Sequence, residues 1–371
     1  MKTFKGLTWD HPRGYRPLQA WAREDGAVKV DWAVQKLEGF ESHPIDELAE
    51  RYDFLIVDNP GIGEAAEKGC LRPLEAFLSE AQLSFLRNSS VGPSFDSYQY
   101  YGRHWAIPID AAAQVCALAG QAASAQPDTW QEVLRLSRLN PGRVALSLGG
   151  PHALLTFYAI SLSLGGTLFL GNDFVLDKAV AAQALTFMRE IYSSQQPGLV
   201  DLNPIGLLDE MAQGRVDLCP AIFGYVNYAT PDDGRPVSFV DIPHCGEPAM
   251  RGSILGGTGL AISVHCGLTP GLIDHIMRYV SERVQSTLVV ENGGQPANVR
   301  AWHDHHANEL TGNFFRNTFS TVANAYVRPK YHGYIPFQDS SSAIVRDGLV
   351  SGKQAGDIFD AIRENHGRYL P

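Results

Sequence analysis

Cys116 is a residue whose type and position could do covalent chemistry. It follows Asp110 and Gln114 in a segment with the pattern of an extended strand. A cysteine becomes a nucleophile when a neighbouring base or cation lowers its pKa. No motif ties Cys116 to a particular histidine or glutamate, and small buried cysteines are common in protein cores. Cys116 is therefore a candidate nucleophile beside the simpler interpretation as a core residue.

Two further clusters are weaker candidates for a metal or phosphate site. The run His303-Asp304-His305-His306 contains ligand types that zinc or nickel binds. Consecutive histidines on a helix point to different faces, however, and no distant third ligand is specified, so we expect a solvated helix and no metal ion. The segment Gly256-Gly257-Thr258-Gly259 lacks the G-x-G-x-x-G register of a nucleotide site. Its glycines permit close approach of the backbone or a bend of the chain, and we expect no cofactor.

Polar residues also follow predicted strands directly. Tyr52 to Asp58 is a nearly continuous apolar run that suits a parallel strand buried on both faces, and Asn59 comes next. Thr3 to Trp9 is a shorter run that enters a polar, turn-rich stretch. Ligands of open α/β sheets bind at the carboxyl ends of such strands. Asp58 also has the alternative role of capping the helix that follows Pro60.

The elements that must position these residues alternate between strand and helix. The first sixty residues predict a βαβα start with a third strand, and residues 128–222 predict a second α/β unit. Between them, Trp105–Ile109 and Ala113–Leu118 are predicted as two extended pieces on either side of Asp110. The 371 residues exceed the length at which single cores tend to split, so we expect two domains.

Composition excludes several classes of protein. The 40 acidic and 30 basic side chains give a formal net charge of −10, which disfavours nucleic acid as a partner. No segment approaches the length of a membrane span, and no leader precedes the first strand, so we expect a soluble chain without an export signal. The five cysteines are odd in number and contain no CxxC pair, which argues against a disulfide framework or a zinc ribbon. They are Cys70, Cys116, Cys219, Cys245 and Cys266.

Over nearly its full length the chain resembles the family 1 extracellular solute-binding proteins of ABC importers. The similar segments, in order, are Leu7–Tyr15, Tyr52–Gly61, Gly102–Val115, Leu255–Ser263 and Gln285–Gln295 with Trp302. Their order and spacing carry the resemblance, since none of them is diagnostic alone.

The resemblance implies an α/β fold of the type II periplasmic-binding-protein kind, with two Rossmann-like lobes, a hinge and an interlobe cleft. We expect residues 1–110 with 260–305 to form the N-terminal lobe, and residues 111–255 with 306–371 to form the C-terminal lobe. It also implies a monomer that captures a small-molecule solute by lobe closure and presents it to an ABC permease. No covalent chemistry is expected in this role.

The resemblance places the ligand contacts at strand ends, at the crossover and in one loop of the second lobe. These candidate ligand-binding residues are Trp9, Asp10, His11, Arg13, Asp58, Asn59, Asp110, Phe223, Tyr225, Asn227, Gly256, Gly257, Thr258 and Trp302. Each has a structural alternative: the two tryptophans are typical core residues, and Asp110 could instead pair with Arg103.

Two questions stay open at this point. The ligand is a sugar or polyol, or a small organic acid held by Arg13. The alternative function is a cytoplasmic enzyme derived from this fold, similar in architecture to thiaminase I, using Cys116 or the group Asp10, His11 and Asp58. The absence of a leader favours the cytoplasm if the chain is full length, and a periplasmic or extracellular location is the alternative if a leader was removed.

Overall fold

The structure, a computed structural model, describes residues 3–36, 45–246 and 251–370. It divides into two compact units, each made of discontinuous segments. The first unit is Met1–Ala112 with Leu255–Arg316, and the second is Ala113–Ile254 with Asn317–Pro371. The chain thus passes between the units after residues 112, 254 and 316. The last division lies beyond the predicted residue 305 because α14 (His305–Leu310) packs beside α13 (Val299–His303) within the first unit.

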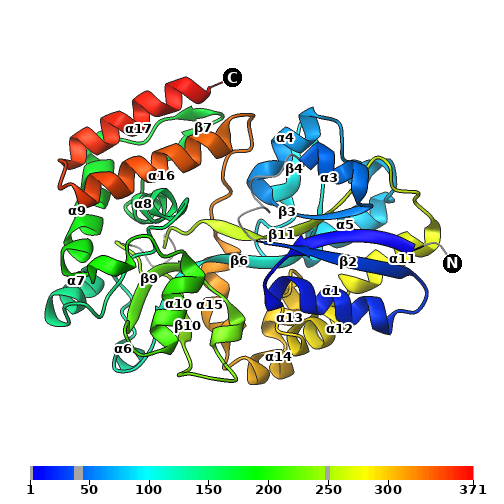
Figure 1. The fold of residues 1–371 in the computed structure, drawn as a ribbon, viewed down its shortest axis with the longest axis horizontal. Coiled ribbons are helices and arrows are strands. Elements are labelled where there is room, and N and C mark those ends of the chain that lie inside the picture. Colours follow the sequence, from blue (N-terminus) through cyan, green and yellow to red (C-terminus); the bar gives the residue numbers. More distant parts are fainter. Residues whose placement is uncertain (1–2, 37–44, 247–250, 371) are drawn as a thin grey trace. The chain divides into compact units, whose positions relative to one another are not determined.

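The first unit is built on a mixed sheet, in which the first three strands of the chain are parallel to one another. Strand β1 (Thr3–Trp9) pairs in parallel with β2 (Lys29–Gln35) and with β3 (Phe54–Asp58). Strand β11 (Leu255–Ile262) runs antiparallel to β3, and β6 (Ile107–Leu118) lies on the other side of β11. The apolar run predicted at residues 52–58 is therefore a central strand, covered by neighbours on both sides (Figure 1).

The helices of the first unit join or cover these strands. They are α1 (Pro12–Glu24), α3 (Ile45–Arg51), α4 (Ile62–Glu67), α5 (Glu80–Ser89), α11 (Pro270–Tyr279), α12 (Glu282–Val284), α13 and α14, with a π-helical turn at Gln285–Val289 and a short hairpin β4 (Gln99–Tyr100) and β5 (Arg103–His104). Helix α1 buries Leu18 and Trp21 and ends at Asp25, whose carboxylate accepts from Arg278 and bonds His275 of α11, each at 2.6 Å.

Strand β6 continues from the first unit into the second without a break. The sequence predicted two extended pieces there, but all twelve residues are strand and all are buried. In the second unit β6 is the middle strand, antiparallel to β9 (Leu218–Phe223) on one side and β10 (Ser238–Val240) on the other. Buried neighbours on both sides supply backbone partners for the small residues of this strand, which lack strong strand propensity of their own.

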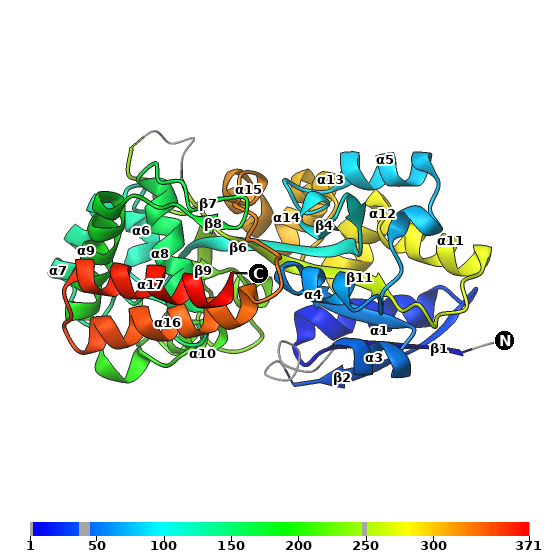
Figure 2. The same cartoon turned by 90° about the horizontal axis from the view of Figure 1, so that it is seen from above.

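Helices form most of the second unit. They are α6 (Ala122–Ala125), α7 (Trp130–Leu139), α8 (His152–Ser163), α9 (Lys178–Ser194), α10 (Pro204–Ala212), α16 (Tyr334–Val350) and α17 (Ala355–Tyr369), with a hairpin β7 (Phe169–Leu170) and β8 (Asp173–Phe174). Helix α15 (Phe314–Ala323) begins in the first unit and ends in the second. The two C-terminal helices α16 and α17 lie side by side (Figure 2).

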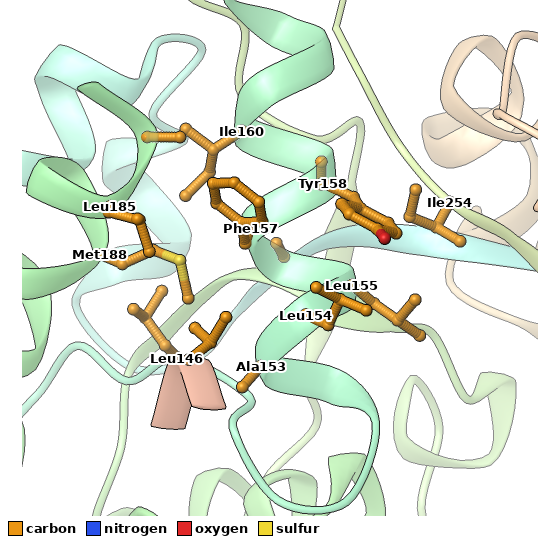
Figure 3. Packing of buried hydrophobic residues seen from close by; sticks show 14 of the residues in the cluster. Leu146, Ala153, Leu154, Leu155, Phe157, Tyr158, Ile160, Leu185, Met188 and Ile254 are labelled. Carbon is orange, nitrogen blue, oxygen red and sulfur yellow. The ribbon is translucent and has the colours of Figure 1, made fainter. Parts of the chain in front are cut away.

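Helix α8 is the centre of the second unit's core. It is apolar around its whole circumference, which is typical of a helix enclosed on every side. Phe157 and Ile160 of α8 pack toward Leu185 and Met188 of α9 (Figure 3). Packing against α9 therefore holds α8 in the core of the second unit.

We predict that Phe157→Ala lowers the free energy of unfolding by about 3–5 kcal/mol, because it removes a fully buried ring and leaves a cavity. Leu139→Ala is the matched control: Leu139 is 64% exposed on α7, and its truncation should change stability by less than about 0.5 kcal/mol. Urea denaturation followed by circular dichroism measures both. Equal losses would contradict the assignment of α8 to the core.

Candidate functional site

Polar residues from three strands meet at one edge of the first unit's sheet. Parallel strands β1 and β3 end at the same edge, so His11 and Asp58 follow them there. Thr258 of β11 lies opposite Asp58 in the antiparallel register. Asp10 is exposed at this edge, and Asn59 is fully buried beneath it. The structure therefore brings these predicted residues together, as their positions at strand ends indicated.

A buried ion pair joins the first loop to the crossover strand. The Nε atom of Arg13 donates to Oδ2 of Asp110 at 2.8 Å, and its Nη2 atom bonds Oδ1. The two side chains are only 4% and 9% exposed. Asp110 therefore pairs with Arg13 rather than with Arg103, which is exposed on β5. Because the guanidinium already holds a carboxylate in two-pronged geometry, its charge is compensated within the protein.

His11 caps helix α1, and its ring stacks on that of Trp9. Its Nδ1 atom accepts from the Arg13 backbone N–H at 3.2 Å, and its ring lies parallel to Trp9 at 5.2 Å between centroids. Burial, with the positive charges of Arg13 and Arg16, lowers the pKa of His11 from 6.5 to about 3. His11 is thus a neutral acceptor at physiological pH.

The two tryptophans of the candidate set are core residues in this structure. Trp9 is 4% exposed, with His11 against its ring and the Arg13 guanidinium 5.8 Å from its centroid. Trp302 is fully buried, its indole N–H donates to the Pro296 carbonyl at 2.7 Å, and Phe315 packs edge-on against it. A ligand has no access to the ring of Trp302 in this arrangement, so we leave that residue out of the proposed site.

Asp58 and Gly257 each have a structural role at the edge. Asp58 accepts from the backbone N–H of Asn59 at 2.8 Å and so caps the short turn Asn59–Gly61. Gly257 has a φ of +98°, and a Cβ atom there would lie 2.4 Å from the Asp110 carbonyl oxygen and 2.8 Å from the Ala111 Cα. Glycine is required at this point because β11 and β6 approach closely.

The second unit contributes an aromatic loop at the end of β9. Phe223 is half-buried at the strand's last position, Tyr225 is 9% exposed, and Asn227 is half-buried in the turn that follows. The predicted residues of this loop thus lie together at the carboxyl end of one strand. Their contact with a ligand stays a prediction.

His152 is a residue of this region that the sequence interpretation missed. It begins α8 and meets the Phe223 ring edge-on at 5.7 Å between centroids. Burial and the nearby Arg328 charge lower the pKa of His152 to about 3, so its imidazole is neutral. A signal for it existed in the sequence: His152 ends the turn-forming stretch Gly-Gly-Pro-His at 149–152, which directly follows the largely apolar run 144–148.

Cys116 is fully enclosed in the core of the second unit. Burial raises the pKa of its thiol well above the ordinary value, and the neighbouring Cys219 acts in the same direction. The thiolate is the reactive form, so this environment opposes the activation that a nucleophile needs.

The three histidines of this run are exposed, and Asp304 caps α14 by accepting from the Ala307 backbone N–H at 2.8 Å. His305 lies 3.8 Å from Glu309 and His306 lies 3.5 Å from Glu291. Within residues 3–36, 45–246 and 251–370, no group of three or more His, Cys, Asp or Glu side chains is arranged to hold a metal ion. In the same ranges no helix is both long and apolar enough to cross a membrane.

Comparison with solved structures identifies the architecture. An ABC transporter solute-binding protein from Agrobacterium radiobacter K84, solved with ribitol, matches with a TM-score of 0.80 at 18% identity, over 99% of this chain and 98% of that one. Maltose-bound MalE3 of T. maritima matches with a TM-score of 0.81 at 16% identity, over 99% and 100% of the two chains. The chain has the fold of ABC-transporter solute-binding proteins.

Further comparisons agree on the fold class. A solute-binding protein from Thermotoga lettingae TMO, bound with α-D-tagatose, has a TM-score of 0.78 at 19% identity, with both chains covered completely. The predicted fold class, α/β of the periplasmic-binding-protein kind, is therefore confirmed. No family model matches the sequence, and no curated protein does.

We predict that Asp110→Asn lowers the free energy of unfolding by about 3 kcal/mol, because it leaves the buried Arg13 cation without its counter-charge. Asp360→Asn is the control: Asp360 pairs with Lys178 at the surface, both more than half exposed, and should contribute less than about 1 kcal/mol. Chemical denaturation at pH 7 compares them. A small loss for Asp110→Asn would mean that Arg13 is compensated by other groups.

The low pKa of the helix-capping His11 should make the protein less stable as the pH falls. The unfolded chain binds a proton at His11 below pH 6.5, whereas the folded state resists it until about pH 3. Stability therefore falls as pH falls from about 6 to 4, by up to about 1.4 kcal/mol per pH unit from this group. His11→Asn keeps a capping acceptor but removes the titration, so its stability should fall less steeply. Parallel pH profiles for the two proteins would exclude this effect.

Proposed function

We propose that this protein is the substrate-binding protein of an ABC importer, of the family 1 kind, and that it captures a small polar solute reversibly. The observation that carries the proposal is the full-length match to solute-binding proteins solved with ribitol, maltose and tagatose. The clustering of polar and aromatic side chains at strand ends supports it, because such groups replace the water around a hydroxylated ligand.

The charges of the site favour a neutral polyhydroxy ligand over an organic acid. Arg13, the one cation in our candidate set, already forms a bidentate ion pair with Asp110. Asp10 and Asp58 add negative charge at the same edge, and His11 is neutral. A carboxylate ligand would meet repulsion there, whereas sugar hydroxyls can donate to the carboxylates.

The number of ring faces favours a small ligand. Trp9 and Trp302 are buried in the first unit and Tyr225 is only 9% exposed, so the aromatic surface of the candidate set reduces mainly to the half-buried ring of Phe223. Oligosaccharides generally need several exposed ring faces in succession. We therefore infer a polyol or monosaccharide as the solute.

Reversible binding accounts for these residues better than catalysis does. Cys116 is enclosed with a raised pKa, and His11 is a helix cap with a pKa near 3, too low for a base at neutral pH. An importer role requires an ABC permease as partner. The role also requires that the protein lie on the side of the membrane from which an importer takes up its solute. This location is the periplasmic or extracellular alternative given above.

A thermal-shift screen tests the function. Ribitol, mannitol, tagatose and glucose would be compared with the acids ribonate and gluconate, each at millimolar concentration. We expect one neutral compound to stabilise the protein, by about 2.7 kcal/mol at one hundred times its Kd, and to be recovered unchanged. Tyr225→Ala should reduce this shift, whereas Leu139→Ala should not.

Three results would contradict the proposal. A shift with the sugar acids alone would favour the carboxylate alternative. Conversion of the compound, detected by mass spectrometry, would favour the enzyme alternative. Stabilisation of Tyr225→Ala equal to that of the unmodified protein would remove the aromatic loop from the site.

A further inference from the structure

Gln114 is a fully buried side chain whose polar atoms are unused. Neither its Oε1 nor its Nε2 atom has a hydrogen-bond partner among the residues that the structure describes. Its backbone is held firmly: the N–H donates to the Ile254 carbonyl at 3.2 Å, and the carbonyl accepts from the Ser253 hydroxyl at 2.7 Å. The side chain is thus placed by its strand, and no hydrogen bond among the described residues uses its amide. Other buried side chains of the described residues also leave one polar atom unpaired, but Gln114 leaves both of its polar atoms unpaired, and the cost of such burial calls for an explanation.

The surroundings of Gln114 place it beside the aromatic loop. In the antiparallel ladder of β6 and β9, Gln114 lies directly opposite Phe223. Side chains of directly opposed residues project from the same face of a sheet, so the amide and the ring are neighbours. Phe223 is half-buried, so its ring is the part of this spot that solvent reaches, and the amide of Gln114 lies enclosed beside it.

His152, a half-buried side chain, adds a second buried polar atom at the same spot. Its ring meets Phe223 edge-on at 5.7 Å, and its Nδ1 atom also has no hydrogen-bond partner in the described part of the chain. The imidazole is neutral, because burial and Arg328 lower its pKa to about 3. Arg328 itself donates to Gln338 at 2.9 Å.

The chemistry of the pair specifies what it can bind. An amide offers two donors and an acceptor, and a neutral imidazole offers one of each. Neither group carries a charge that would attract an ion. Their natural complement is a group that donates and accepts together, such as adjacent hydroxyls, with the carbon face of the ligand against Phe223.

We propose that Gln114 and His152 are specificity-determining residues that bind two hydroxyl groups of the solute beside Phe223. This inference rests on the proposed function and adds a polar subsite to it. The unpaired atoms of the ligand-free protein are then a cost in stability that binding recovers. Such a residue affects stability and affinity in opposite directions. Replacing it with an apolar side chain stabilises the ligand-free protein but weakens ligand binding.

Gln114→Met tests the proposal, with Gln195→Met as the matched control. Gln195 is also a buried glutamine of the second unit, and its Nε2 atom is likewise unpaired, but its Oε1 atom accepts from the Leu146 backbone N–H at 2.8 Å. We expect Gln114→Met to have an unchanged or higher Tm without ligand and at least about tenfold weaker binding of the tightest neutral compound, by calorimetry. Gln195→Met should show the reverse: a lower Tm and unchanged affinity.

Several outcomes would overturn the proposal. A lower Tm for ligand-free Gln114→Met would contradict it and would assign Gln114 to a structural, water-bonded role. An affinity of Gln114→Met equal to that of the unmodified protein would contradict it as well. Should Gln114→Met fail to fold, His152→Phe is judged by the same two measurements. If the unmodified protein binds none of the compounds, the importer function fails, and the Tm of ligand-free Gln114→Met still decides whether its amide is structural.

Discussion

The buried ion pair between Arg13 and Asp110 is the interaction on which the polar strand-end edge of the first unit depends. Two charges removed from water are tolerated only when each compensates the other, so the loop after β1 must place Arg13 against β6. That placement sets the stack of Trp9, His11 and Arg13 and puts the His11 ring in position to cap α1. It also removes the cation that a carboxylate ligand would need, so a structural requirement of the loop limits the chemistry of the site.

The close approach of β11 and β6 is the second constraint. Gly257 accommodates the Asp110 carbonyl where any side chain would collide with it. The glycine-rich segment is part of strand β11, which begins at Leu255, although Gly257 has a positive φ within it. The same closeness holds the peptide of Asp110 rigid, and with it the carboxylate that pairs with Arg13. The close packing of β11 on β6 and the ion pair of Asp110 with Arg13 therefore both act at the same residue of β6.

The two units differ in what they offer a ligand. Carboxylates, a neutral histidine and backbone groups gather at the strand ends of the first unit, whereas the Phe223 ring and the unpaired side-chain atoms of Gln114 and His152 lie together in the second. In a rigid core such as that around α8, polar atoms left without partners are a cost that folding alone does not explain. Their presence beside a half-exposed ring is the kind of local inconsistency that function produces.

The sequence by itself determined the alternation of strands and helices, the fold class and the positions of polar residues after β1 and β3. These features depend on local patterns: the apolar run that ends at Asp58, for example, predicts a buried strand and a polar end without reference to the rest of the chain. Tertiary structure alone decided that Asp110 pairs with Arg13, 97 residues away, and that Trp302 is buried. It also decided that β6 is continuous and that His152 meets Phe223. Each of these depends on contacts between distant segments, and the type of a residue does not specify which distant partner will compensate its charge or cover its ring.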